Sequence, residues 1–254
     1  MRFDVATSEL LAIMLGAIRA SAWLVICPPF NSRIIPGPVK ALLSVALALP
    51  MAPYLTGTLP ALKTSALIVS SAEQVMIGAA LGFITALFFA ALQAAGDLID
   101  VFGGFTLAFA FDPLSQTQSS VFGRFYNLIA VTLLFASDGH QLVLRGFLQS
   151  YKTLPLNENL SMETLNRLLT EGLGELFLAA LQIAGPLIAV LFLTDVAFGL
   201  LNRVAPALNA FQLGFPAKIF LVVTLAGTAI TVLPRALDGL ISKAVSAVVH
   251  ITGG

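Results

Sequence analysis

Long runs of apolar residues alternate with short polar connections along this chain. Residues 74–96 and 176–194 carry no charged side chain, and a helix that crosses a bilayer needs about 20 such residues. Residues 41–62 are also uncharged, but prolines interrupt their second half, so we expect that helix to end near Pro50 or Tyr54. The pattern predicts an all-α membrane protein of about six long, Pro/Gly-broken helices, near residues 8–27, 38–54, 66–100, 121–151, 160–202 and 212–248.

The polar positions predict the character of the connections. Residues 28–40 are rich in proline and should form a structured turn. Residues 152–175 contain Glu158, Glu163, Glu171 and Glu175, and we expect a water-facing amphipathic hairpin there. Further connections are expected to be a polar break at Asp138-Gly139-His140 and a polar turn over 202–212 that makes a hairpin of the last two helices.

The segment 101–120 has a different pattern from the rest of the chain. From residue 105 to 111, bulky residues occupy the odd positions and small ones the even positions, a period of two that is typical of an extended chain. Two glycines precede this stretch and a turn-forming pair ends it. The residues are Gly103 and Gly104, then Phe105, Leu107, Phe109 and Phe111, then Asp112-Pro113.

A continuing helix is the alternative for this segment, since Phe102, Phe105 and Phe109 also fit helical spacing. From the pattern alone both conformations stay open. Extended backbone at membrane depth is tolerated only inside protein or beside a water-filled cavity, because its N–H and C=O groups would otherwise lack partners. An extended, Phe-bearing segment would therefore indicate a constriction or a plug, and apolar constrictions close pores by excluding water.

Composition agrees with a membrane protein. Hydrophobic residues make up 58% of the 254 residues and charged residues 10%, against about a quarter charged in soluble domains. The net charge of zero gives no indication of a nucleic-acid partner. Basic residues do not gather in alternate connections. Either the spans are miscounted or the chain does not thread back and forth like a standard bundle.

The sequence offers little support for a catalytic or metal-binding site. Ser137, Asp138 and His140 are sequence neighbours without the turn that presents a nucleophile, so we reject a catalytic triad. His140 and His250 lie far apart, and no pair of metal ligands has suitable spacing. We therefore expect no enzyme activity, no metal and no cofactor.

Charged residues in apolar surroundings are functional candidates. Asp97 and Asp100 share a helix face. One interpretation makes them a proton or ion relay of a secondary transporter. The other makes them residues that pair with a partner subunit. We favour the pairing with a partner subunit, because most of the charged candidates fall near predicted helix ends. Gly78 and Gly82 have the spacing that permits close helix approach. The other charged candidates are Arg19, Glu73, Asp195 and Arg203.

Motifs along nearly the whole chain follow one another in an informative order. They are Pro29-Phe30, Ile35-Pro36 and Val39-Lys40; Glu73 with Gly78 and Gly82; Gly104-Phe105, Ala108, Asp112-Pro113, Gly139-His140, Ser150 and Leu154-Pro155; and Asn202 to Pro206, Leu208-Asn209, Phe211 and Leu213 to Pro216.

This order resembles the FliR family of flagellar biosynthesis proteins and their counterparts in type III secretion. One departure is Ala207, where the family usually has Gln, so this chain lacks the side-chain amide for a polar contact with a neighbouring subunit at that position.

The resemblance implies a subunit of an export gate in the bacterial cytoplasmic (inner) membrane, at the flagellar basal body, through which unfolded flagellar proteins pass. Its implied partners are P-type and Q-type gate subunits, the switch-type membrane export subunit and the large export-gate ring protein. It implies helical hairpins with a re-entrant plug-like loop, a P-type-like part over 1–155 and a Q-type-like hairpin over 156–254, without a soluble domain. The plug segment would be Phe102–Ser120.

The expected functional residues follow from both lines of reasoning. The gate or plug residues are Phe102, Gly103, Gly104, Phe105, Leu107, Phe109, Phe111, Asp112 and Pro113. The candidates for a subunit interface are Gly78, Gly82, Asp97, Asp100, Asn202, Arg203, Pro206 and Asn209.

Overall fold

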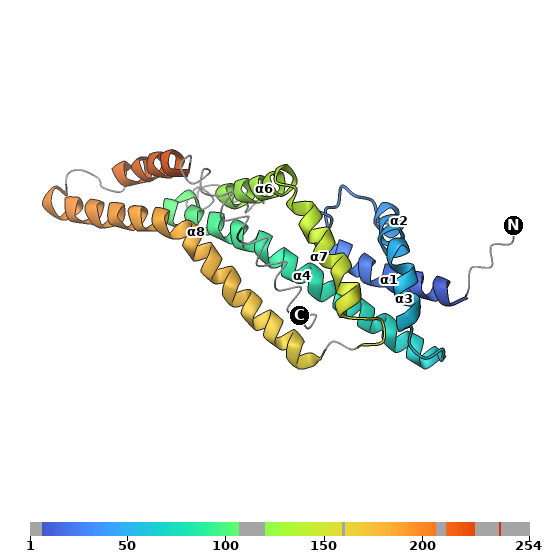
Figure 1. Cartoon of the computed structure of the whole chain (residues 1–254). Helices are drawn as coiled ribbons and strands as arrows, with labels where there is room; N and C mark the ends of the chain where they lie inside the picture. Colours follow the sequence, from blue (N-terminus) through green and yellow to red (C-terminus); the bar gives the residue numbers. More distant parts are fainter. Residues whose placement is uncertain (1–6, 107–119, 159–160, 207–211, 227–238, 240–254) are drawn as a thin grey trace. The chain divides into compact units, whose positions relative to one another are not determined.

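The chain folds into helices joined by turns, as Figure 1 shows for the computed structural model. The structure describes residues 7–106, 120–158, 161–206, 212–226 and 239. No strand occurs in these ranges, and the all-α prediction is confirmed. The helices are α1 (Thr7–Ile26), α2 (Gly37–Ala48), α3 (Ala52–Leu55), α4 (Thr64–Gly103), α6 (Val121–Ala136), α7 (Gly139–Thr153), α8 (Met162–Val204) and a shorter apolar helix, Gln212–Ala226.

Within the described residues, four stretches are long and apolar enough to cross a membrane. They are α1, the stretch Gly37–Thr58, α4 and α8. The pair α6 and α7 counts as a fifth if it is one broken span, because its two helices meet at an angle of 79°. These lengths and compositions confirm a membrane protein.

The region predicted as a helix near 38–54 extends further than expected. After α2 the chain continues in short helical turns to Thr58. Pro50 and Pro53 each lie in the first two positions of a new turn, where the missing N–H breaks no helical hydrogen bond. Proline therefore divides the helix here without ending it.

The prediction of a water-facing hairpin over 152–175 is wrong. After a turn, α8 begins at Met162 and runs unbroken through the acidic residues into the apolar stretch. Glu163, Arg167 and Glu171 are spaced by four residues and are all exposed, so they share one polar face of a single helix. These charged residues therefore form the solvent-exposed start of α8 and not a separate hairpin.

The predicted polar break near Asp138 is confirmed. Asp138 adopts a left-handed backbone conformation with φ of 56° between α6 and α7, a conformation that Asp tolerates better than most residues. Its backbone carbonyl accepts from the Gln141 N–H at 2.9 Å, and its carboxylate accepts from the Gln141 amide at 3.2 Å. Asp138 thus begins α7 after a sharp change of direction.

The described residues divide into two compact units. The first contains those up to 88 and from 137 to 173, and the second those from 89 to 136 and from 174 to 239. This division differs from the boundary at residue 155 that the resemblance implies, and the likeness to two subunit types stays a prediction.

In the first unit, α1 packs closely on the first part of α4. A side-chain carbon placed on Gly78 would meet the backbone of Arg19, and one on Gly82 would meet the backbone of Trp23. Trp23 is buried and stacks on Phe147 of α7, with ring centroids 4.4 Å apart. The close helix approach therefore exists, but its partner is α1 of the same chain. This face of α4 has no room for another subunit.

Arg19 lies fully buried at the centre of the first unit. Its Nε donates to Gln74 Oε1 at 2.7 Å, and its terminal nitrogens donate to the carbonyls of Ser150 and Leu154 at 3.0 and 2.8 Å. The guanidinium carbon also lies 4.8 Å from the centroid of the Tyr151 ring. The two carbonyls lie at the end of α7, where that of Ser150 also accepts from the Leu154 N–H at 2.9 Å and Leu154 is the C-cap residue. Arg19 thereby joins α1, α4 and α7 inside the chain.

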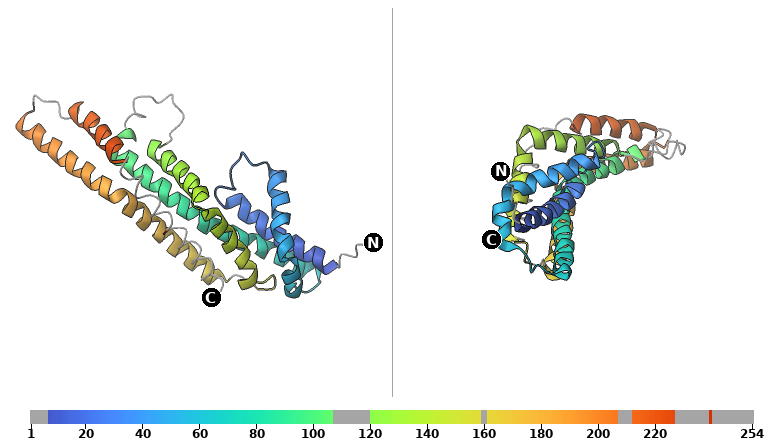
Figure 2. Two further views of the ribbon diagram at one scale, coloured as in Figure 1. Left: turned by 45° about the horizontal axis from the view of Figure 1, so that its top comes forward. Right: turned by 90° about the vertical axis from the view of Figure 1, so that its right-hand side faces the viewer.

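In the second unit, the helix Gln212–Ala226 lies antiparallel to the last part of α8 (Figure 2). Lys218 pairs with Asp195, and the earlier Gly214 lies by the ring of the later Phe198. This order of contacts confirms the predicted hairpin of the last two helices.

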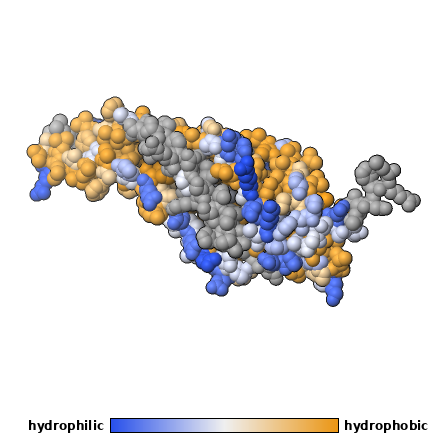
Figure 3. All heavy atoms as spheres, in the orientation of Figure 1, coloured by the Kyte–Doolittle hydropathy of each residue, from blue (hydrophilic) through white to orange (hydrophobic). Residues whose placement is uncertain are grey.

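The apolar surface of α8 is largely exposed. Only 22% of its most apolar window is buried, against 56% in α4. Phe177, Phe192 and Leu200 are each more than half exposed, and Figure 3 shows apolar side chains over much of the visible surface. Such a surface suits contact with lipid or with other apolar protein, because soluble monomers rarely present large apolar patches.

Candidate functional site

The plug segment begins at a sharp break in the second unit. α4 ends at Gly103, and Gly104 follows with φ of 82°, a left-handed conformation that glycine adopts without strain. Phe105 and Thr106 then return to helical conformation. Of the two conformations that the sequence left open, the helical one therefore holds at Phe105 and Thr106. The predicted residues Leu107, Phe109, Phe111, Asp112 and Pro113 lie outside the described residues.

The other end of the plug segment is tied to α4 by Asp100. The carboxylate of Asp100 accepts hydrogen bonds from the Ser120 hydroxyl and from the Phe122 N–H, the latter at 3.0 Å. The Ser120 oxygen in turn accepts from the Gly123 N–H at 2.8 Å, which makes Ser120 the N-cap of α6. Asp100 is only 1% exposed. A buried carboxylate therefore holds the first turn of α6.

Asp97 adds a second carboxylate beside the same helix end. A side-chain carbon on Gly123 would meet the Asp97 carboxylate, so Gly123 allows its close approach. The N-terminus of a helix carries partial positive charge and unpaired N–H groups, both of which favour carboxylates. Within the described ranges, one buried oxygen each of Asp97 and Asp100 has no hydrogen-bond partner.

The backbones of α4 and α6 touch at this point. A side-chain carbon on Gly96 would meet the backbone of Phe122. The Phe122 ring also makes an edge contact with Phe105, with centroids 5.3 Å apart. We call Gly96, Asp97, Asp100, Ser120 and Phe122 the anchor. It brings Ser120 and Phe122, at the start of α6, against the end of α4 and, through the ring contact, against Phe105.

Replacing Ser120 by alanine is expected to loosen the first turn of α6. The change removes the N-cap and one donor to Asp100, a loss of about 1 kcal/mol. Hydrogen exchange of the Phe122 and Gly123 amides should accelerate about five-fold.

A matched control is Ser161→Ala, since Ser161 accepts from the Thr164 N–H at 3.1 Å at the start of α8. This variant should accelerate exchange of Thr164 while α6 is unaffected. Unchanged exchange at Phe122 in Ser120→Ala would contradict the capping role.

The remaining predicted residues lie elsewhere. Asn202, Arg203 and Pro206 are exposed at the end of α8, and Asn209 lies outside the described residues. Their predicted role in a subunit interface stays a prediction. Asp195 does not stand alone, because Lys218 of the following helix pairs with it at 2.5 Å.

Three functional candidates were missed in the sequence. Ser120 directly precedes an apolar run and carries a recognisable N-cap signal. Lys218 is a cation in an apolar stretch, which is itself a signal. Gly96 is one of many small residues of α4, and nothing in the sequence distinguishes it.

The contacts of the anchor are hydrogen bonds and close packing that position helices. The Asp100 carboxylate is engaged with the end of α6, and nothing in the described residues favours a proton relay of a secondary transporter. Likewise Asp138 contributes its polar groups to the start of α7. The arrangement holds the start of α6 against the end of α4.

Comparison with known proteins identifies the chain. The sequence model of the protein family described as bacterial export proteins, family 1, matches residues 10–244 of this chain. The chain belongs to this family. It is therefore a membrane subunit of a flagellar or related type III export apparatus.

Individual relatives agree with the family. This export-family chain is 33% identical to the flagellar biosynthetic protein FliR of Pectobacterium carotovorum, over 89% of this chain and 87% of the relative. Identity to FliR of Bacillus subtilis is 30%, over 82% of each chain. The surface presentation of antigens protein SpaR of Shigella flexneri is 31% identical, over 59% of this chain and 58% of the relative.

Proposed function

We propose that this export-family chain is a non-enzymatic subunit of the flagellar protein export gate and that its plug segment closes the channel for unfolded flagellar proteins. The observation that carries the proposal is the backbone break at Gly104, directly after the 40-residue helix α4. A gate needs a fixed support and a point of rotation. The long helix provides the first, and a glycine in the left-handed conformation provides the second.

The anchor supports the same proposal. A closing loop must return to the same place after each opening, and Asp100 fixes its exit by bonds to Ser120 and Phe122. The residues between the two fixed ends include the apolar side chains of the period-two pattern. Apolar side chains that converge on a narrow pore close it by excluding water and ions.

The flagellar system and the membrane are part of the proposal. Three flagellar relatives match 82–89% of this chain, and SpaR matches 59%. We place the chain in the bacterial cytoplasmic membrane at the flagellar basal body. There it would assemble with P-type and Q-type gate subunits, the switch-type membrane export subunit and the large ring protein. The exposed apolar surface of α8 supports extensive contact with such subunits or with lipid.

Deleting Gly104–Phe111 tests the proposal. Assembly should be largely intact, because the anchor and the helices are kept, but cells or vesicles should leak ions at rest. The measurement is ion flux across membranes that contain the assembled gate, in the absence of export substrate.

A second variant keeps the length of the loop. Serine at positions 105, 107, 109 and 111 removes the apolar closure without removing residues, and it should leak to a similar degree. The four serines are compared with the exposed change Gln93→Ser on α4, which should not leak. If both plug variants export normally and conduct no more than the unaltered protein, the gating proposal is wrong.

A further inference from the structure

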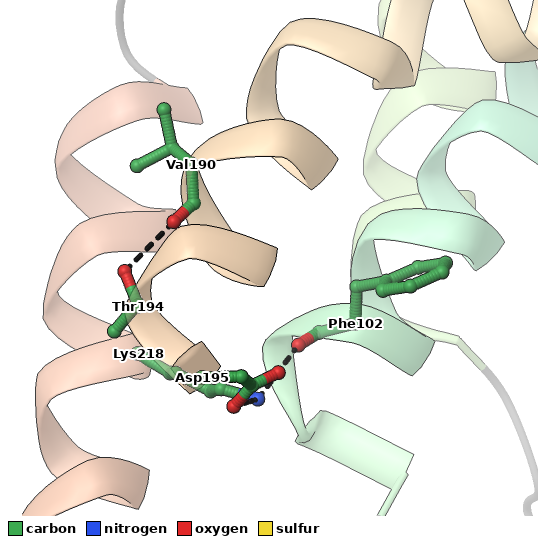
Figure 4. Close-up of polar contacts among 5 residues, drawn as sticks. All are labelled: Phe102, Val190, Thr194, Asp195 and Lys218. Atoms are coloured by element: carbon green, nitrogen blue, oxygen red, sulfur yellow. Dashed lines mark hydrogen bonds and ion pairs between the residues drawn. The ribbon is translucent and has the colours of Figure 1, made fainter. Parts of the chain in front are cut away.

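The base of the plug segment rests on the C-terminal hairpin. Lys218 of the helix Gln212–Ala226 donates from Nζ to the backbone carbonyl of Phe102 at 3.4 Å (Figure 4). One turn further along the same helix, Val222 is fully buried, and a side-chain carbon on Gly103 would lie 2.9 Å from its Cγ2. Two residues of one helix face therefore contact the last two residues before the break at Gly104.

The same lysine is tied to α8. Its Nζ lies 2.5 Å from Asp195 Oδ1, and the exposed fractions of the two side chains are 18% and 52%. Asp195 compensates the charge of a lysine that is largely covered, and Figure 4 shows its carboxylate and the Phe102 carbonyl converging on one ammonium group. Close by, Thr194 donates to the Val190 carbonyl within α8.

The Phe102 carbonyl can accept a hydrogen bond from Lys218 only because α4 ends directly after it. The last four carbonyls of a helix have no partner within it, and a cation near that end is favoured by the helix dipole. Because α4 ends at Gly103, the Phe102 carbonyl is available to Lys218. If residues beyond Gly104 swing away and drag the end of α4 with them, this contact must change.

We propose that Lys218 and Asp195, with Val222 beneath Gly103, form a latch that holds the base of the plug segment on the C-terminal hairpin while the gate is closed. The inference rests on the proposed gating function. It adds that opening requires the end of α4 to separate from the helix Gln212–Ala226. Movement of the hairpin and movement of the plug segment are then coupled through one ammonium group and one buried valine.

Cross-linking tests the contact and the movement together. The double change Gly103→Cys and Val222→Cys puts two thiols at a separation that a disulfide spans, since the two Cβ atoms lie within roughly 4.5 Å. The native Cys27 is buried in the first unit and is kept. In the assembled gate, a membrane-permeant oxidant should form the bond, visible as loss of thiol labelling, and export should stop until a reductant is added.

Two results would overturn the latch. If the bond does not form in the assembled gate, the contact is absent there. If it forms and export continues at the rate of the single-cysteine controls, the end of α4 does not have to move.

Removing the ammonium group gives an independent measurement. Lys218→Met should raise the resting ion leak about two- to five-fold, as expected for loss of a partly exposed ion pair with one further hydrogen bond. Lys218→Arg keeps the charge and should leak less than Lys218→Met. The matched control, Arg167→Met, removes an exposed cation from α8 in the first unit and should not leak.

The outcomes separate the latch from the gate. If the serine-substituted plug leaks while Lys218→Met does not, the latch is wrong and the gate stands. If neither leaks, the proposed gating function itself fails.

Discussion

Arg19→Met is expected to destabilise the fold so strongly that the steady-state amount of the chain in membranes falls to a small fraction of normal. Methionine fills a similar length of side chain but donates no hydrogen bond, so the Leu154 carbonyl and the Gln74 amide oxygen lose the donors that Arg19 supplies. Leaving a buried acceptor unsatisfied costs about 1–3 kcal/mol. With the lost contact to the Tyr151 ring, the total is roughly 3–5 kcal/mol, a large share of an ordinary folding free energy.

Arg19→Lys should be intermediate. A lysine places one ammonium group where the guanidinium reaches three acceptors in different directions. The measurements are the steady-state amount of tagged chain in membranes and the thermal midpoint of the purified assembly in detergent. Arg167→Met serves as the control, because Arg167 is exposed on α8. An Arg19→Met protein of normal abundance and normal midpoint would show that this buried network contributes little.

Gly96→Leu is expected to separate α6 from α4 and so to disrupt the anchor. The first atom of any side chain at position 96 meets the backbone of Phe122. Backbone cannot turn aside as a flexible side chain does, so the strain should reach or exceed the roughly 1–3 kcal/mol of ordinary overpacking. The bonds of Asp100 to Ser120 and Phe122 should then break.

The readout for Gly96→Leu is hydrogen exchange over the first turn of α6, together with export. Gln93→Leu is the matched control, since Gln93 lies one turn earlier on α4 and is exposed. We expect rapid exchange and loss of export in the glycine variant alone. Equal behaviour of the two variants would mean that the close contact of α4 with α6 is dispensable.

The helices could be predicted because each depends on residues that are adjacent in sequence. Apolar runs such as 74–96 and 176–194 lie inside α4 and α8, and the break at Asp138 follows from local polar residues. The error over 152–175 has a local cause too. Charges spaced by four residues fit one helix face as well as a hairpin, and Gly172 and Gly174 resemble a turn signal although both lie inside α8.

The site was harder to predict because its contacts join distant parts of the chain. Asp100 was recognised as a charge in apolar surroundings, but its partner Ser120 lies 20 residues away. Arg19 meets Ser150 and Leu154 across more than 130 residues. The small residues of α4 look alike in sequence, yet Gly78 and Gly82 face α1 and Gly96 faces α6. Pattern identifies such residues as unusual, and only packing identifies what each one touches.

The exposed apolar helix α8 has a consequence for how much of this protein a cell can keep. Its 43 residues follow about 65 Å of helix path, roughly twice the hydrocarbon thickness of a bilayer. Its charged first turns can face water, but exposed apolar side chains further along, such as Phe177, Phe192 and Leu200, need lipid or partner subunits to cover them. We expect orphan copies to be removed by membrane proteolysis, so that the supply of assembly partners, and not the rate of synthesis, sets the abundance of this subunit.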